Sequence, residues 1–311
     1  MKAPFVIDEH LTGIALAYTN RAMIADLVLP RIGVGKQEFK WNLFAQDERY
    51  TVPDTKVGRS SRVNEVEFGA TEQTDSTEDY GLEDPIPQND IDNAFEGYDP
   101  TGHAAEALTD LILLDREVRV ASLVHDPATY PANRKETLAN DAKFDAPNSD
   151  PIEVIGDALD VPLMRPNQLV MGRDAFRILS RNPQIVKAAH MNDGDAGIAR
   201  RAAIAELFEV EEVLVGEGFV NTAKPGQAPT FSRVWGDSIA LLHKNTAVTT
   251  RSGVTFGYTA QWGGRVGMQR PDPDIGLRGG VRVRVGESVK EVITAADVGY
   301  LISSVTGYVA P

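Results

Sequence analysis

A 37-residue stretch, from Val63 to Asp99, contains twelve acidic residues and no lysine or arginine. It is rich in Thr, Asp, Glu, Gly and Pro and poor in core-forming side chains, so it cannot build a hydrophobic core of its own. It is also too long for an ordinary connection between secondary-structure elements. The chain must therefore leave this segment solvated or order it on a partner.

The residues around the acidic stretch favour an extended arm over a solvated loop. The preceding segment, Arg21 to Arg62, carries eight bases and five acids. Residues 63–68 alternate with the two-residue period of a strand, and residues 58–62 are typical of a basic turn. These patterns predict a hairpin with one basic and one acidic limb that pairs with neighbouring copies of the chain.

A long helix is predicted directly after the arm. Asp99 is a suitable N-cap and Pro100 suits the first helical position, and apolar residues then recur at steps of three and four until Pro127. The pattern predicts a helix of about 39 Å lying across a sheet. The residues expected on its buried face are Ala104, Leu108, Leu111, Leu114, Val118, Ala121 and Val124.

The other elements alternate between strand and helix patterns. Strands are predicted at 36–44, 169–171, 213–215, 235–242 and 281–285, and helices within 11–29, at 174–179 with Asp174 as the cap, and at 198–208. The apolar end of the chain, 293–309, is expected to pack back on the body. Strands and helices in mixed order indicate an α+β fold.

No motif in the sequence predicts a reactive or ligand-binding site. The chain has no cysteine, which excludes disulfides, thiolate metal sites and a cysteine nucleophile. Its five histidines lack metal-ligand spacing, and Gly33–Gln37 lacks the full pattern of a phosphate loop. We therefore expect no catalytic residues, no cofactor and no metal.

Charge and hydropathy argue against nucleic acid and membranes as general binding partners. The net charge of −14 opposes general binding to a phosphate backbone. No run of 18 apolar residues is present, so no membrane-spanning helix is expected. The first ten residues lack the pattern of a secretory signal.

Several stretches, read in order, resemble the major capsid proteins of tailed bacteriophages. They are Leu11–Tyr18 with Asn20, Ile24–Pro30, Lys36–Lys40, Tyr80–Pro87, Leu169–Gly172 with Asn182 and Pro183, Val213–Gly216 and Trp235–Asp237. The resemblance implies that family's fold, and from it we expect five segments. They are an N-terminal arm (1–40), an extended loop or E-loop with its flanks (41–97), a first part of the P-domain with the spine helix (98–160), an A-domain (161–255), and a P-domain return with the C-terminus (256–311).

The resemblance also implies a structural role rather than an enzymatic one. The chain is expected to assemble as hexamers and pentamers into an icosahedral shell that encloses double-stranded DNA without sequence-specific binding. Portal and scaffolding proteins are expected partners, a decoration protein is a further candidate, and no membrane is involved. Synthesis is expected in the bacterial cytoplasm and final location in the virion. Many relatives begin with a scaffolding segment that a protease removes; because this sequence begins at the arm, a separate scaffold or a trimmed chain is expected.

Ten residues are predicted to contact neighbouring subunits. They are Leu11, Ile14 and Tyr18 on the arm, and Arg49, Lys56, Arg59, Arg62, Glu65, Glu67 and Glu72 on the loop and its flanks. Two alternatives stay open at this point. One is the shell protein of an encapsulin-type nanocompartment, and the other is a cytosolic enzyme with an unrecognised site.

Overall fold

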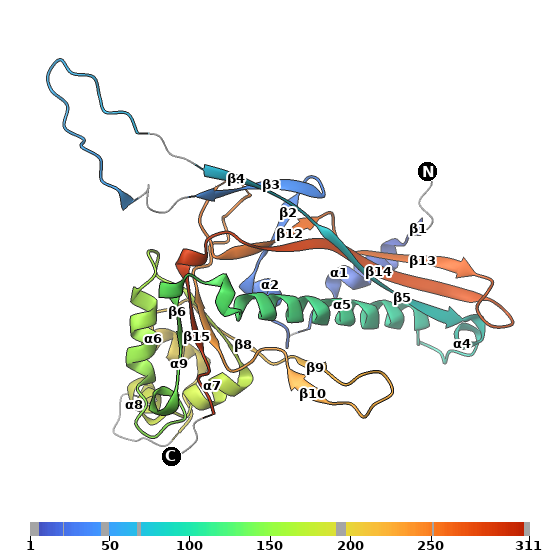
Figure 1. The fold of residues 1–311 in the computed structure, drawn as a ribbon. Helices are drawn as coiled ribbons and strands as arrows, with labels where there is room; N and C mark the ends of the chain where they lie inside the picture. Colours follow the sequence, from blue (N-terminus) through green and yellow to red (C-terminus); the bar gives the residue numbers. More distant parts are fainter. Residues whose placement is uncertain are drawn as a thin grey trace.

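The computed structural model describes residues 6–20, 22–44, 50–66, 70–190, 197–250 and 252–307. Within them the chain forms two large sheets that meet near one end of a long helix, two small two-stranded sheets, and a loop that extends away from the body (Figure 1). The mixture of sheets and helices confirms the predicted α+β class.

The first sheet has six strands. Its order is β1-β13-β14-β12-β2, and β5 pairs with the first part of β14. All neighbours are antiparallel except β12 and β2, which are parallel. The bounds are β1 (Val6–Ile7), β2 (Arg31–Val34), β5 (Glu78–Pro87), β12 (Gly257–Trp262), β13 (Val266–Asp272) and β14 (Gly280–Ile293).

The long helix α5 (Pro100–Val124) lies along this sheet, as predicted (Figure 1). The Asp99 carboxylate accepts the Thr101 N–H at 3.0 Å and caps the helix, with Pro100 in the first turn. Alternation in β14 places Val283 and Val285 against the helix, where both are fully buried.

The predicted buried face of α5 was wrong for three of its residues. Leu111 is 53% exposed and Leu114 and Val118 are only half-buried, whereas Arg116 and Glu117 are fully buried. The apolar spacing cannot distinguish two apolar stripes on the same helix, and it gives no weight to charged residues that find partners inside the protein.

Three short helices flank the first sheet. The region 11–29, where a short helix was predicted, contains most of α1 (Glu9–Ala17) and all of α2 (Ala25–Val28), and α4 (Gln88–Asp92) follows β5. Helix α1 sits on β13 at Gly267, where a Cβ atom would come within 2.6 Å of the Leu11 backbone. The close approach buries Leu11 and Ala15 in the core beneath α5.

The second sheet has five strands in the order β6-β15-β11-β7-β8. Helices pack on it around a large apolar core (Figure 1). The strands are β6 (Lys135–Thr137), β7 (Gln168–Gly172), β8 (Glu212–Gly216), β11 (Ile239–Leu242) and β15 (Gly299–Ser303), and the helices are α6 (Pro151–Asp160), α7 (Arg173–Leu179), α8 (Pro183–His190) and α9 (Arg201–Leu207). Short 3₁₀ helices cover Pro127–Thr129, Ala132–Arg134, Asn140–Ala142 and Ala296–Val298.

Details of this second module correct the local predictions. Helix α7 begins after Gly172, so Asp174 lies in its first turn instead of capping it. The end of the chain does pack back: β15 pairs with β11 and β6. The boundaries of the five predicted segments remain a prediction. Strands β6 and β15 belong to the same sheet as β7, β8 and β11, although the prediction assigned them to segments outside the A-domain.

Two hairpins project from the body (Figure 1). One pairs β3 (Glu38–Phe44) with β4 (Ala70–Ser76), and the other pairs β9 (Phe219–Asn221) with β10 (Phe231–Arg233). The strand predicted at 63–68 was wrong for the described part, because residues 63–66 are extended without strand pairing. Residues 67 and 68 lie outside the described residues.

Candidate assembly surfaces and the charged cluster

The loop beyond β3 and β4 has no core of its own. Every residue from 50 to 66 is exposed, and the loop leaves the body on one side (Figure 1). The Ser61 N–H donates to the Gly58 carbonyl at 3.1 Å, which forms the predicted turn, and Asn64 Nδ2 donates to the Asp54 carbonyl at 2.6 Å. These two contacts hold the limbs together, but they do not cover the apolar side chains.

Valines are the most informative part of this loop. Val52 is 89% exposed, Val63 69% and Val66 51%. Burial of one such side chain is worth roughly 1.5–3 kcal/mol. A loop that exposes several of them and also holds no internal core is suited to an interface with another molecule.

The acidic stretch does not stay in the loop. From Glu78 onward it becomes β5, and its acids meet basic side chains of the subunit's own β14. Glu78 pairs with Lys290 at 2.8 Å, and Glu83 pairs with Arg284. Two acids of the predicted acidic limb are therefore paired within the subunit, and the register places Arg284 directly opposite Glu83.

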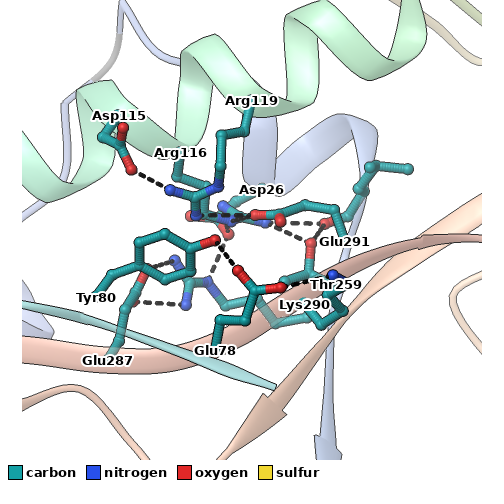
Figure 2. Close-up of polar contacts among 12 residues, drawn as sticks. Asp26, Glu78, Tyr80, Asp115, Arg116, Arg119, Thr259, Glu287, Lys290 and Glu291 are labelled. Atoms are coloured by element: carbon teal, nitrogen blue, oxygen red, sulfur yellow. Dashed lines mark hydrogen bonds and ion pairs between the residues drawn. The ribbon is translucent and has the colours of Figure 1, made fainter. Parts of the chain in front are cut away.

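A charged cluster lies where β5 and β14 cross beneath α5 (Figure 2). The Arg119 guanidinium lies 3.7 Å from the centre of the Tyr80 ring and donates to Glu291 at 3.1 Å. The Tyr80 hydroxyl donates to Glu78 at 3.1 Å. The strand that leads back from the extended loop is thereby attached to the long helix.

Arg116 extends the cluster toward the N-terminal arm (Figure 2). Its guanidinium is 1% exposed, pairs with Asp26, and donates to the Thr259 hydroxyl at 2.8 Å. Burial acts to raise the pKa of Asp26, but the charges of Arg116 and Arg31 outweigh it and the pKa lies below its ordinary value. The carboxylate is held in its charged form.

Glu287 holds the other side of the same cluster. Arg31 donates to it at 2.8 Å and Arg265 at 3.1 Å. Burial acts to raise the pKa of Glu287, yet the hydrogen bond and charge of Arg31, with Arg265 and Arg116, lower it below the ordinary value. A buried charge supports a fold only when partners of this kind satisfy it.

Glu117 joins three segments on the neighbouring turn of α5. It accepts the backbone N–H groups of Ile24 at 2.8 Å and Ala25 at 2.7 Å, and the Trp235 indole N–H at 2.5 Å. Burial raises the pKa of Glu117 above its ordinary value, although these donors act against the rise. The carboxylate takes the place of a side-chain cap for α2, whose own N-cap residue makes no cap hydrogen bond.

The ten predicted contact residues fall into distinct environments. Lys56, Arg59, Arg62 and Glu65 are exposed on the loop, whereas Arg49 and Glu67 lie outside the described residues. Glu72 is exposed but pairs with Lys40 across the β3–β4 ladder. On the arm, Ile14 and Tyr18 are half-buried.

Leu11 requires a correction. Its side chain is 2% exposed and belongs to the core beneath α5, so it has no surface left for another subunit. The apolar strip of the arm serves the subunit's own core first, because α1 lies flat against β13 and α5.

The cluster residues were missed by the sequence analysis, although one signal for them existed. Leu113, Arg116, Glu117 and Val120 follow the i, i+3, i+4, i+7 spacing of one helix face. Charged residues within an apolar stripe indicate buried partners. Which segments supply those partners could not be read from spacing, because Asp26, Thr259 and Glu287 are far away in the sequence.

Among the described residues, no group of three His, Asp or Glu side chains lies close enough to hold a metal ion. In the same part of the chain, no helix combines the length and apolar character needed to cross a membrane.

Comparison with known proteins gives a consistent result, although no family model matches the sequence. The chain is 52% identical over 302 residues to the major capsid protein of Pseudomonas phage JBD67, covering 97% of this chain and 98% of that protein. It is 30% identical over 316 residues to the major capsid protein of Burkholderia phage BcepMu, covering 97% of each chain.

Solved structures extend the likeness in fold. A phage-related protein from Bordetella bronchiseptica superposes with a TM-score of 0.76 at 23% identity, covering 97% of this chain and 98% of the other. The capsid of cyanophage P-SCSP1u superposes with a TM-score of 0.60 at 11% identity, covering 93% of this chain and 90% of that chain. An encapsulin complex from Synechococcus elongatus superposes with a TM-score of 0.51 at 11% identity, covering 95% of this chain and 93% of that chain.

Proposed function

The chain belongs to the family of phage major capsid proteins and forms the shell of a phage particle, and on this premise we propose which of its surfaces join the copies. The extended loop, residues 50–66, lies over a neighbouring subunit and buries Val52, Val63 and Val66 there. The observation that carries this proposal is that every residue of the loop is exposed, with Val52, Val63 and Val66 between 51% and 89% exposed. A structure with no cover for these side chains gains stability only from another copy.

The basic residues of the loop set its orientation on the neighbour. Lys56, Arg59 and Arg62 are exposed, and Glu72, Glu78 and Glu83 of the adjoining strands already pair with bases of the same subunit. Rim ion pairs contribute about 0–1 kcal/mol each, so their effect lies in docking geometry more than in affinity. The proposed contact set also includes Ile14, Tyr18, Glu65 and the exposed Glu72. Arg49 and Glu67 are further proposed members.

The wider assembly follows the family. Copies assemble as hexamers and pentamers into a closed icosahedral shell, which holds the DNA without reading its sequence. Portal and scaffolding proteins, and a decoration protein, are the proposed partners, and the host cytoplasm is the proposed site of synthesis. The shell is proposed to have no catalytic activity, in keeping with the structural role named for both sequence relatives.

The encapsulin alternative rests on likeness in fold alone. The encapsulin structure is 11% identical, whereas the phage proteins are 52% and 30% identical over nearly the whole chain. These identities favour a shell around a genome over a shell around cargo enzymes.

Replacement of the loop tests the proposal. A variant in which residues 51–66 give way to a short Gly-Ser linker should fold, because these residues contribute nothing to the cores, and should form no shells. The deletion must stop before β4 and β5, whose pairing with β3 and β14 belongs to the body. Electron microscopy and sedimentation measure the yield of assembled shells, and circular dichroism shows whether the variant subunit is folded.

A matched variant separates apolar burial from charge. Replacing Val52, Val63 and Val66 by Ser should abolish shells at all salt concentrations, whereas replacing Lys56, Arg59 and Arg62 by Ala should slow assembly chiefly at low salt. Normal shells from the linker variant would overturn the proposal.

A further inference from the structure

The spine helix α5 has a second apolar stripe that the subunit leaves uncovered. Ala107 and Leu111 are exposed and Leu114 and Val118 are half-buried, and their spacing of four, three and four places them on one side of the helix. Leu111 alone is 53% exposed. Ala107 and Leu111, the exposed part of this stripe, contribute little to the subunit's own packing.

Acidic side chains border this stripe. Glu106 and Asp115 are exposed beside it, and Asp110, half-buried, accepts a hydrogen bond from Asn20 at 2.8 Å. Arg119 pairs with Asp115 as well as with Glu291, so the edge that carries Asp115 is balanced within the helix. Arg116 is buried and does not reach the other edge. The outward face of α5 is therefore apolar along its centre and negative along the edge that carries Glu106 and Asp110.

The β9–β10 hairpin has the opposite character. Its register pairs Phe219 with Arg233 and Asn221 with Phe231, so these four side chains lie on one face of the hairpin. Phe219 is 51% exposed and Phe231 67%. The hairpin projects from the second module (Figure 1), and both rings are exposed in the single subunit.

Charge on the hairpin matches that on the helix. From Gly218 to Gly236 the sequence contains Lys224 and Arg233 and no acid. Arg233 is engaged with Asp174 at 3.3 Å and covers one side of the Phe219 ring, whereas Lys224 is exposed in the turn. A two-stranded hairpin of this size is marginally stable alone and gains from a surface to pack on.

We infer that the β9–β10 hairpin of one subunit docks on the outward face of α5 of a second copy, with Phe231 against Leu111 and Lys224 beside Glu106. Both surfaces are exposed within one subunit, so a second copy is the occupant that satisfies them together. Such a contact joins different surfaces of two identical chains and can close into a ring. The inference rests on the assembly of the chain into a shell.

Point variants test the two surfaces. Phe231→Asp and Leu111→Asp should each give folded, soluble subunits, with shell yield reduced by about tenfold or more, as expected for an interface anchor. Ser232→Asp, on the other face of the same strand, is the matched control and should assemble normally. Normal shells from Phe231→Asp, or equal loss from Ser232→Asp, would overturn the inference.

Cysteine chemistry tests the pairing directly, because the natural chain contains no cysteine. In a variant carrying both Asn221→Cys and Ala107→Cys, a short bis-maleimide should link assembled subunits into a ladder of multimers on a denaturing gel. Each single variant should give no ladder. A link within one chain, seen as a monomer of altered mobility, would contradict docking between copies, as would assembled shells that give no ladder.

These outcomes are separable from the role of the extended loop. If the wild-type chain forms no shells, the proposed function fails. If it forms shells and the double-cysteine variant also assembles without linkage, the inference about the hairpin fails alone.

Discussion

Glu117 illustrates how much depends on one buried carboxyl group. It receives three hydrogen bonds, from Ile24, Ala25 and Trp235, and so connects α2, α5 and the second module. Each buried donor that loses its acceptor costs about 1–3 kcal/mol. The position therefore has more influence on stability than its single side chain suggests.

Glu117→Leu should lower the free energy of unfolding of the unassembled subunit by about 3 kcal/mol or more, since three buried donors lose their acceptor. Glu117→Gln keeps one acceptor oxygen and should lose less. Denaturant unfolding measures both. The exposed Glu206→Leu is the control and should change stability by no more than about 0.5 kcal/mol; equal effects at the two positions would contradict the role of Glu117.

At the scale of elements, Trp235 determines how closely β7 and β8 approach the segment before β11. Its side chain is fully buried, and a Cβ atom at Gly216 would lie 2.0 Å from Trp235 Cδ1. At Gly172 an added Cβ would lie 2.2 Å from the Gly236 carbonyl oxygen. These two strand-ending glycines allow close packing against Trp235 and Gly236.

Gly216→Ala should destabilise the subunit by about 1–3 kcal/mol, the usual cost of overpacking a dense core. Gly156→Ala is its counterpart within α6, where an added Cβ meets nothing within 4 Å. That variant should gain about 0.5–1 kcal/mol from reduced backbone entropy in the unfolded chain. Thermal unfolding compares the pair, and a tolerated alanine at 216 would show that Trp235 can move.

At the scale of the whole molecule, the charged cluster attaches the arm, the spine helix and the long strand β14 to one another. Asp26 comes from the arm, Arg116 from α5 and Glu287 from β14. Since the pKa values of Asp26 and Glu287 lie below their ordinary values, the folded subunit binds protons at these groups less readily than the unfolded chain does. Their contribution is present above the ordinary carboxyl pKa and is lost as pH falls toward the lowered values.

The stability difference between the wild-type subunit and Glu287→Gln should therefore be largest near neutral pH. It should shrink as pH falls below about 4.3, the ordinary value for glutamate, because protonation of Glu287 makes the wild type resemble the variant. Denaturant unfolding at a series of pH values measures the difference. A difference that stays constant from neutral pH to well below that value would show that the charge of Glu287 is not what stabilises the cluster.

Much of the architecture follows from local sequence. Asp99 and Pro100 start α5, alternation places Val283 and Val285 on one face of β14, and an acidic stretch without core residues predicts an extended segment. Local spacing determines these features because a helix cap, a strand period and the lack of apolar area act over a few residues. The exposed loop contains the predicted turn at 58–62 but only the first residues of the acidic stretch, whose strand at 63–66 was not found and whose residues 78–87 pair within the subunit's own sheet.

Other features were decided only by the tertiary structure. The sequence could not show that Leu11 is buried in the subunit's own core, that Leu111 faces outward, or that Arg116 and Glu117 face inward. Their environments depend on segments distant in the chain: β13 lies under α1, and β14 and the arm lie beside α5. Hydrophobic spacing records which side chains avoid water, whereas the partner of a buried charge is chosen by contacts that exist only after the chain has folded.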